Sequence, residues 1–125
     1  MTKEEIRNYC DRLTQFDTPT ISNALECFSD FKRGTGFMDY TIKPVVSCTT
    51  TYVGPVATAK IATEFPATPE EQAKMMPYYQ HVKDMGPGCI VVQQDMDPKP
   101  VGSFWGEVNA TQHLALGCQG VVTSG

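Results

Sequence analysis

The chain has 125 residues, of which 41% are hydrophobic and 19% charged, and its formal net charge is −4. This composition is ordinary for a soluble globular domain, and the acidic pI near 5.0 with scattered basic residues argues against a nucleic-acid surface, which needs clustered Lys and Arg. No apolar run approaches the roughly 20 residues that span a bilayer, and the N-terminus lacks the apolar stretch of a secretory signal. We therefore expect a cytoplasmic protein with neither a membrane nor a nucleic-acid partner.

The N-terminal part of the chain predicts two helices and a loop. Thr2 and Glu5 form a capping box, and the apolar residues that follow at helical spacing predict a helix over about Lys3–Leu13. Pro19 fits the first turn of a second, short helix. The polar, glycine-containing segment Ser29–Tyr40 predicts a loop.

Three β-prone segments follow this loop. Ile42–Val46 predicts a strand, and Thr49–Val53 and Val56–Ile61 are rich in β-branched residues. Gly54-Pro55 lies between the last two segments, so the pattern leaves open whether they form one bent strand or two.

The C-terminal half alternates helices and strands. The segment Thr68–Glu71 is typical of a helix N-terminus, with Thr68 as the N-cap. Pro77 interrupts the helical pattern that follows, so we expect the helix to begin again at Pro77 and to end near Met85. The remaining predicted elements are strand Cys89–Gln93, loop Asp95–Trp105, helix Glu107–Leu116 and strand Gly120–Thr123. This β-α-β order predicts a layered α/β domain with some parallel pairing.

The five cysteines predict structural thiols. Their number is odd, and no two have the C-x-x-C spacing of a redox or zinc pair. Each has apolar neighbours in the sequence, where a reduced cysteine behaves as a small hydrophobic residue. We expect Cys10, Cys27, Cys48, Cys89 and Cys118 to be packed in apolar surroundings without a disulfide.

The clearest candidate site is the start of the last predicted helix. Gly106-Glu107 places a carboxylate beside free backbone N–H groups, where an anionic substrate or a hydrated metal ion could bind. The alternative is that Glu107 only complements the helix dipole, worth about 0.3–1 kcal/mol, while Trp105 fills the core. His81 and His113 have no partner at metal-ligand spacing, which favours surface or packing roles.

Two further acids follow the predicted strand Cys89–Gln93. Asp95 and Asp97 either line the crevice at the end of this strand or lie in a solvated loop. The chain has no phosphate-binding glycine loop and no serine-nucleophile motif.

Five segments, in order along the chain, carry a resemblance to a known family. They are DTPTISNAL (Asp17–Leu25), VGPVATA (Val53–Ala59), GPGCIVV (Gly86–Val92), GEVNAT (Gly106–Thr111) and GVVTSG (Gly120–Gly125). Together they resemble the RraA-like family, which includes the 4-hydroxy-4-methyl-2-oxoglutarate aldolases and the regulators of ribonuclease activity.

The resemblance implies a fold and an assembly. It implies an α/β fold, a layered α/β/β/α domain like the swivelling phosphohistidine domains, with a partly parallel sheet. Residues 1–125 would form a single RraA-like domain that lacks the family's C-terminal part, and the chain would self-associate into trimers or hexamers with active sites between subunits. Cys89 replaces an aspartate that is usual in the family, a change expected to affect packing more than chemistry.

The resemblance also implies an activity. The family's aldolases use Mg2+ or Mn2+ to cleave 2-keto acids into pyruvate and a carbonyl fragment, and many decarboxylate oxaloacetate. Glu107 matches the acid of their signature and would act on the metal through a water, whereas the Arg-Asp pair that contains the direct ligand is expected beyond Gly125. Gly106 and the backbone amides of Val108 and Asn109 would hold the substrate carboxylate.

Three alternatives remain open at this stage. Some members of the family are non-enzymatic and inhibit ribonuclease E, and an acidic surface suits contact with a basic protein. A methyltransferase, a label the family has carried, is disfavoured by the lack of a glycine-rich cofactor turn. A short product with neither activity would expose sheet edge and core, so it should oligomerise or be unstable.

Overall fold

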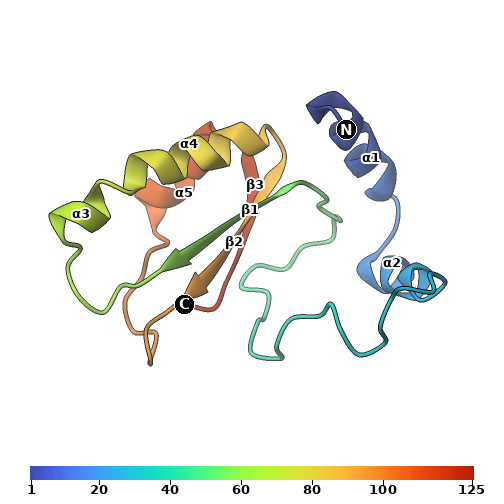
Figure 1. Cartoon of the computed structure of the whole chain (residues 1–125), viewed down its shortest axis with the longest axis horizontal. Helices are drawn as coiled ribbons and strands as arrows, with labels where there is room; N and C mark the ends of the chain where they lie inside the picture. Colours follow the sequence, from blue (N-terminus) through green and yellow to red (C-terminus); the bar gives the residue numbers. More distant parts are fainter. The chain divides into compact units, whose positions relative to one another are not determined.

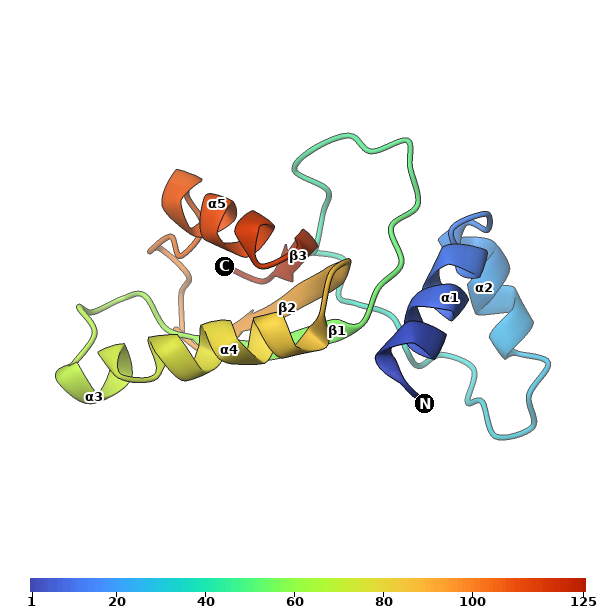
Figure 2. The same ribbon diagram turned by 90° about the horizontal axis from the view of Figure 1, so that it is seen from above.

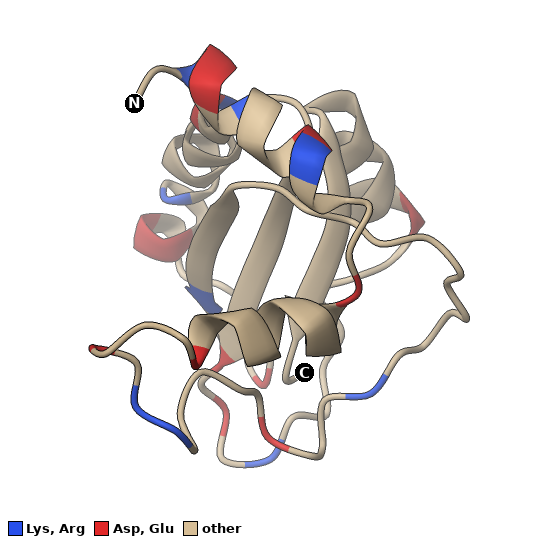
Figure 3. Ribbon diagram, turned by 90° about the vertical axis from the view of Figure 1, so that its right-hand side faces the viewer, with Lys and Arg blue, Asp and Glu red and all other residues tan.

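A computed structural model describes all 125 residues, which divide into two compact units, residues 1–53 and 54–125. The expectation of a single domain over residues 1–125 therefore stays a prediction, and each unit is described by itself. None of the helices combines the length and the apolar content that crossing a membrane requires. Lys, Arg, Asp and Glu residues are spread along the ribbon (Figure 3), and the one ion pair joins Arg33 to Glu26 at 2.9 Å.

The first unit contains the two predicted helices, α1 (Lys3–Leu13) and α2 (Thr18–Leu25), drawn in blue in Figure 1. The Thr2 hydroxyl accepts a hydrogen bond from the Glu5 amide, and the Glu5 carboxylate accepts one from the Thr2 amide, so the predicted capping box is confirmed. At the start of α2 the Asp17 carboxylate accepts from the Thr20 amide. This hydrogen bonding lowers the pKa of Asp17.

The predicted strand Ile42–Val46 is wrong, and Thr49–Val53 forms no strand either. Pro44 cannot donate a ladder hydrogen bond. No other strand pairs with the segment, and Val45 is 99% exposed. None of the residues 1–53 is buried, so the β propensity of these segments is not supported by packing.

The second unit carries one parallel sheet with the order β1-β2-β3, formed by Val56–Ile61, Cys89–Asp95 and Cys118–Thr123. Helices α3 (Pro69–Gln72) and α4 (Met75–Met85) connect β1 to β2, and α5 (Glu107–Ala115) connects β2 to β3. Figure 2 shows α4 and α5 beside the strands. The α/β class and the parallel pairing are confirmed; of the α/β/β/α layers, this unit holds one sheet and one helix layer.

The boundary of α4 differs from the prediction. The helix begins at Met75, two residues before Pro77, rather than at the proline. The third residue of a helix has no intrahelical acceptor for its N–H, so the missing donor of Pro77 costs no helix hydrogen bond there. The last strand likewise begins at Cys118 rather than Gly120.

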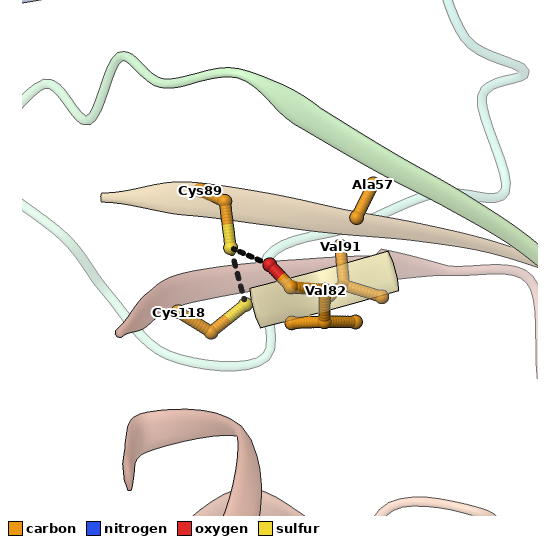
Figure 4. Close-up of a cluster of buried hydrophobic side chains, with 5 residues drawn as sticks. All are labelled: Ala57, Val82, Cys89, Val91 and Cys118. Atoms are coloured by element: carbon orange, nitrogen blue, oxygen red, sulfur yellow. Dashed lines mark hydrogen bonds between the residues drawn. The ribbon is translucent and has the colours of Figure 1, made fainter. Parts of the chain in front are cut away.

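The core of the second unit lies between the sheet and α4. Its members are Ala57, Val82, Cys89, Val91 and Cys118 (Figure 4). The Cys89 thiol lies 3.5 Å from the Cys118 sulfur and donates to the Val82 carbonyl at 3.8 Å. Cys89, which was expected to affect packing, is therefore a core residue.

The prediction that all five cysteines pack in apolar surroundings is confirmed for two and wrong for three. Cys89 and Cys118 are buried, Cys10 is half-buried, and Cys27 and Cys48 are exposed; all five are free thiols. Burial, strengthened by the neighbouring Cys118, raises the pKa of Cys89 to about 11. The other three, which we call the outer cysteines, are Cys10, Cys27 and Cys48. They lie in the unit formed by residues 1–53, in which no residue is buried.

We expect this difference in burial to separate the thiols by reactivity. Because only the thiolate reacts quickly with a disulfide reagent, Cys27 and Cys48 should be modified first in the native protein, and Cys89 and Cys118 only on unfolding. Peptide mapping after a brief treatment with a thiol-modifying reagent checks the order. Labelling of Cys89 as fast as that of Cys48 in the folded protein would contradict the buried pair.

Candidate functional site

Helix α5 begins with its positive end open. Gly106 is the N-cap in an extended conformation (φ −146°, ψ −173°), and no side chain caps the first turn. Glu107 and Val108 are exposed, Val108 by 70%. A side chain at Gly106 would meet no atom within 4 Å. A carboxylate and uncapped N–H groups therefore lie side by side with free space next to them.

The side chain of Asn109 is occupied by the protein itself. Its amide nitrogen donates to the Phe104 carbonyl, and its oxygen accepts from the Tyr79 hydroxyl at 3.0 Å. These bonds tie α5 to the loop before it and to α4. Asn109 can therefore serve a ligand through its backbone N–H but not through its side chain.

A partly buried hydrogen-bond network connects α5 with its neighbouring elements. His113 is 2% exposed, and its Nδ1 lies 2.6 Å from the Asn109 carbonyl oxygen. Because a carbonyl only accepts, we assign the ring proton to Nδ1, which leaves Nε2 to accept from the Tyr78 hydroxyl at 2.6 Å. Tyr78 in turn accepts from Gln93 at 2.9 Å, and the Gln93 oxygen accepts from the Trp105 indole at 2.7 Å.

This network links α4, β2, α5 and the loop entering α5. The Trp105 ring lies 4.5 Å from the His113 ring, centroid to centroid. Surface or packing roles were predicted for the two histidines. His113 has the packing role, and His81 is exposed at the surface. The partners are far apart in sequence, and no local pattern predicts their meeting.

We expect the network to show in the alkaline titration of the tyrosines. Burial, with the nearby Cys118, raises the pKa of Tyr78 to about 12, so its phenolate forms above the ordinary value of 10.0. Its stabilising contribution is present below pH 10 and is lost as the pH rises towards 12. The measurement is phenolate absorbance as a function of pH. The ionisation step at the highest pH should be absent from the titration curve of Tyr78→Phe.

The matched control for this titration is Tyr40→Phe, since Tyr40 is 85% exposed. That change should reduce the total absorbance and leave the last step in place. A last step that survives Tyr78→Phe would show that the Tyr78 hydroxyl is not held in the network.

Asp95 and Asp97 hold the end of β2 in place. One oxygen of Asp97 accepts from the Thr63 amide at 2.6 Å, the Thr63 hydroxyl at 3.2 Å and the Glu64 amide at 2.8 Å. Asp95 accepts from the Asp97 amide at 2.8 Å, and its other oxygen is buried without a partner. The predicted alternatives were a crevice at the strand end and a solvated loop. Asp97 fits the crevice, because it lines a cavity at the strand ends.

The residues present supply only part of a metal site. The chain contains no group of three His, Cys, Asp or Glu side chains placed to hold a metal ion. Glu107 is the one carboxylate at the start of α5, and it could reach a metal through a water.

The comparisons with known proteins bear on this site. A family model described as RraA-like, Aldolase/RraA, matches residues 18–125. The chain belongs to the RraA-like family. No individual curated protein and no solved structure matches the chain. The resemblance expected from the five segments is thus confirmed, and the candidate site at Gly106-Glu107 lies inside the region that matches the RraA-like family.

Proposed function

We propose that this RraA-like protein is a divalent-metal-dependent aldolase of the pyruvate-releasing class. Its substrates would be 2-keto acids of the 4-hydroxy-4-methyl-2-oxoglutarate type, with oxaloacetate decarboxylation as a second activity. The proposal rests on the open start of α5, where uncapped N–H groups adjoin Glu107 within the region that matches the family.

The helix start suits the acid end of such a substrate. The backbone N–H groups of Val108 and Asn109 would donate to the carboxylate, since the positive end of a helix favours a negative charge, and Gly106 leaves room for it. The hydrogen bonds that tie the Asn109 side chain keep these amides in position.

Glu107 would orient and deprotonate a metal-bound water molecule. An exposed carboxylate can orient a water molecule through a hydrogen bond and accept a proton from it. Bound Mg2+ or Mn2+ would supply a Lewis acid for the charge that develops on the keto oxygen. Of the residues in this chain, Glu107 would bind the metal ion, and it would do so through a water molecule.

Pyruvate binding and pyruvate release test the proposal together. With Mg2+ present, pyruvate should shift the amide resonances of Val108 and Asn109 more than those of Glu70 and Glu71 in the first turn of α3. The protein should also release pyruvate from oxaloacetate, and a chelator should abolish the release.

Failure of both measurements would remove the aldolase proposal. Binding to ribonuclease E in their place would favour the non-enzymatic regulator. Self-association into trimers or hexamers belongs to the same proposal, and sedimentation of the full chain measures it.

A further inference from the structure

The cavity that Asp97 lines belongs to the unit formed by residues 54–125 and lies at the carboxyl ends of β1 and β2. Its volume is about 640 Å³, within the ~300–1,000 Å³ range of small-molecule sites. Most of its wall is apolar and includes Ile61, Phe65, Pro66, Met75, Met96 and Phe104. None of the residues proposed to hold the keto acid, Gly106 to Asn109, lines it.

The polar groups of the wall are already paired with one another or with the backbone. Thr68 and Glu71 form a reciprocal capping box at the start of α3. Asp97 accepts three hydrogen bonds from the β1–α3 loop. Gln93 and Tyr78 bond each other and the network behind them. A neutral polar ligand would therefore find few unpaired partners here.

Lys74 is the exception in this wall. Its ammonium group takes part in no ion pair, since the chain's one ion pair is Arg33–Glu26. It adds only the smallest of the effects that lower the pKa of Glu71, after the hydrogen bonds from Thr68. Lys74 is also the N-cap residue of α4, an end that no side chain caps. Lys74 is exposed, and it therefore places an unpaired positive charge in the wall of a mostly apolar cavity, near the hydrogen-bonded carboxylate of Glu71.

Lys60 lines the same cavity but is placed differently. It alternates with Ala59 along β1, and in a strand successive side chains point to opposite faces. Ala57 is in the core, so the alternation places Ala59 on the same face of the sheet and the exposed side chain of Lys60 on the opposite face. Lys74 is thus the one cation that the geometry offers to a ligand in the cavity.

We propose that this cavity binds a small carboxylic acid with an aromatic or branched apolar body. The carboxylate would pair with Lys74, and the body would pack against Phe65, Met75 and Phe104. A charged hydrogen bond in an apolar site is stronger than a neutral one, which selects the acid over its amide. Tyr78, which lines the cavity, is hydrogen-bonded to His113 of α5.

Calorimetric titration of the full chain with hydrocinnamate tests the proposal. This acid has no keto group, so its binding does not depend on the aldolase proposal. We expect saturable binding that weakens on the order of tenfold in Lys74→Met, which removes the charge and keeps most of the stem. Hydrocinnamamide should bind the unmodified protein more weakly by a similar factor.

Two variants serve as controls. Lys83→Met removes a lysine of the same helix that does not line the cavity, and it should bind hydrocinnamate like the unmodified protein. Glu107→Gln should also leave this binding unchanged, whatever it does to pyruvate release. Far-ultraviolet circular dichroism confirms that each variant is folded.

Each contrary result overturns the inference. No saturable binding of hydrocinnamate or of the branched acid isocaproate excludes the cavity as an acid site. Equal affinity for the acid and the amide, or equal losses in Lys74→Met and Lys83→Met, excludes Lys74 as its anchor.

Discussion

Replacing Glu107 with glutamine is expected to slow pyruvate release by roughly 10²–10⁴-fold, the usual contribution of a positioned acid–base group. The glutamine keeps the size of the side chain and its hydrogen-bonding reach but cannot take up a proton at neutral pH. Gly106, the helix start and the tied Asn109 side chain do not depend on the carboxylate, so the fold should persist. Steady-state release of pyruvate from oxaloacetate, with Mg2+ or Mn2+ in the assay, measures the effect.

The matched control for this experiment is Glu70→Gln. Glu70 is also an exposed acid in the first turn of a helix, but it lies in α3. It should leave the rate unchanged. If Glu107→Gln and Glu70→Gln behave alike, Glu107 serves only to complement the dipole of α5, and its proposed role with water is lost.

Replacing Gly54 with alanine is expected to destabilise the protein by about 3 kcal/mol or more, at the upper end of overpacking effects. A methyl group at Gly54 would lie 1.8 Å from the carbonyl oxygen of Gly88 and 3.0 Å from the side-chain nitrogen of Gln119. That carbonyl already accepts from Gln119 at 2.7 Å, so moving it breaks a hydrogen bond. The close approach occurs where β1 joins β2 through the Ile90 amide and the Pro55 carbonyl, at 2.9 Å.

Urea unfolding followed by circular dichroism measures the cost. Gly120→Ala is the control, because Gly120 lies in β3 and a methyl group there would meet no atom within 4 Å. Its effect should stay within about 0.5 kcal/mol. Equal unfolding midpoints for the two variants would show that the chain at Gly54 does not approach Gly88 closely.

The start of α5 illustrates what can be read without the structure. Gly106-Glu107 ends the loop that follows a buried apolar strand, and it precedes a helical pattern; the helix begins at Glu107 as predicted. The capping boxes at Thr2 and Thr68 form as their sequences indicate, because each joins residues three positions apart. The family, too, is visible in short segments along the chain.

The segment Ile42–Val46 and the three outer cysteines show the limit of such patterns. A strand needs a partner, and none pairs with Ile42–Val46. Cys27 and Cys89 both have apolar neighbours in the sequence, yet only Cys89 is buried, because β3 and α4 lie against it. Burial depends on which distant elements meet, and local composition does not specify that.

The amino-acid sequence by itself determined the starts of α1, α3 and α5, the presence of β2 and β3, and the family, since these depend on neighbouring residues and short motifs. Only the tertiary structure decided that His113, Tyr78, Gln93 and Trp105 form one network and that Lys74 stands unpaired at an apolar cavity. These arrangements join residues from separate helices and strands. Their free energy comes from burial and hydrogen bonds that exist only once the sheet has assembled.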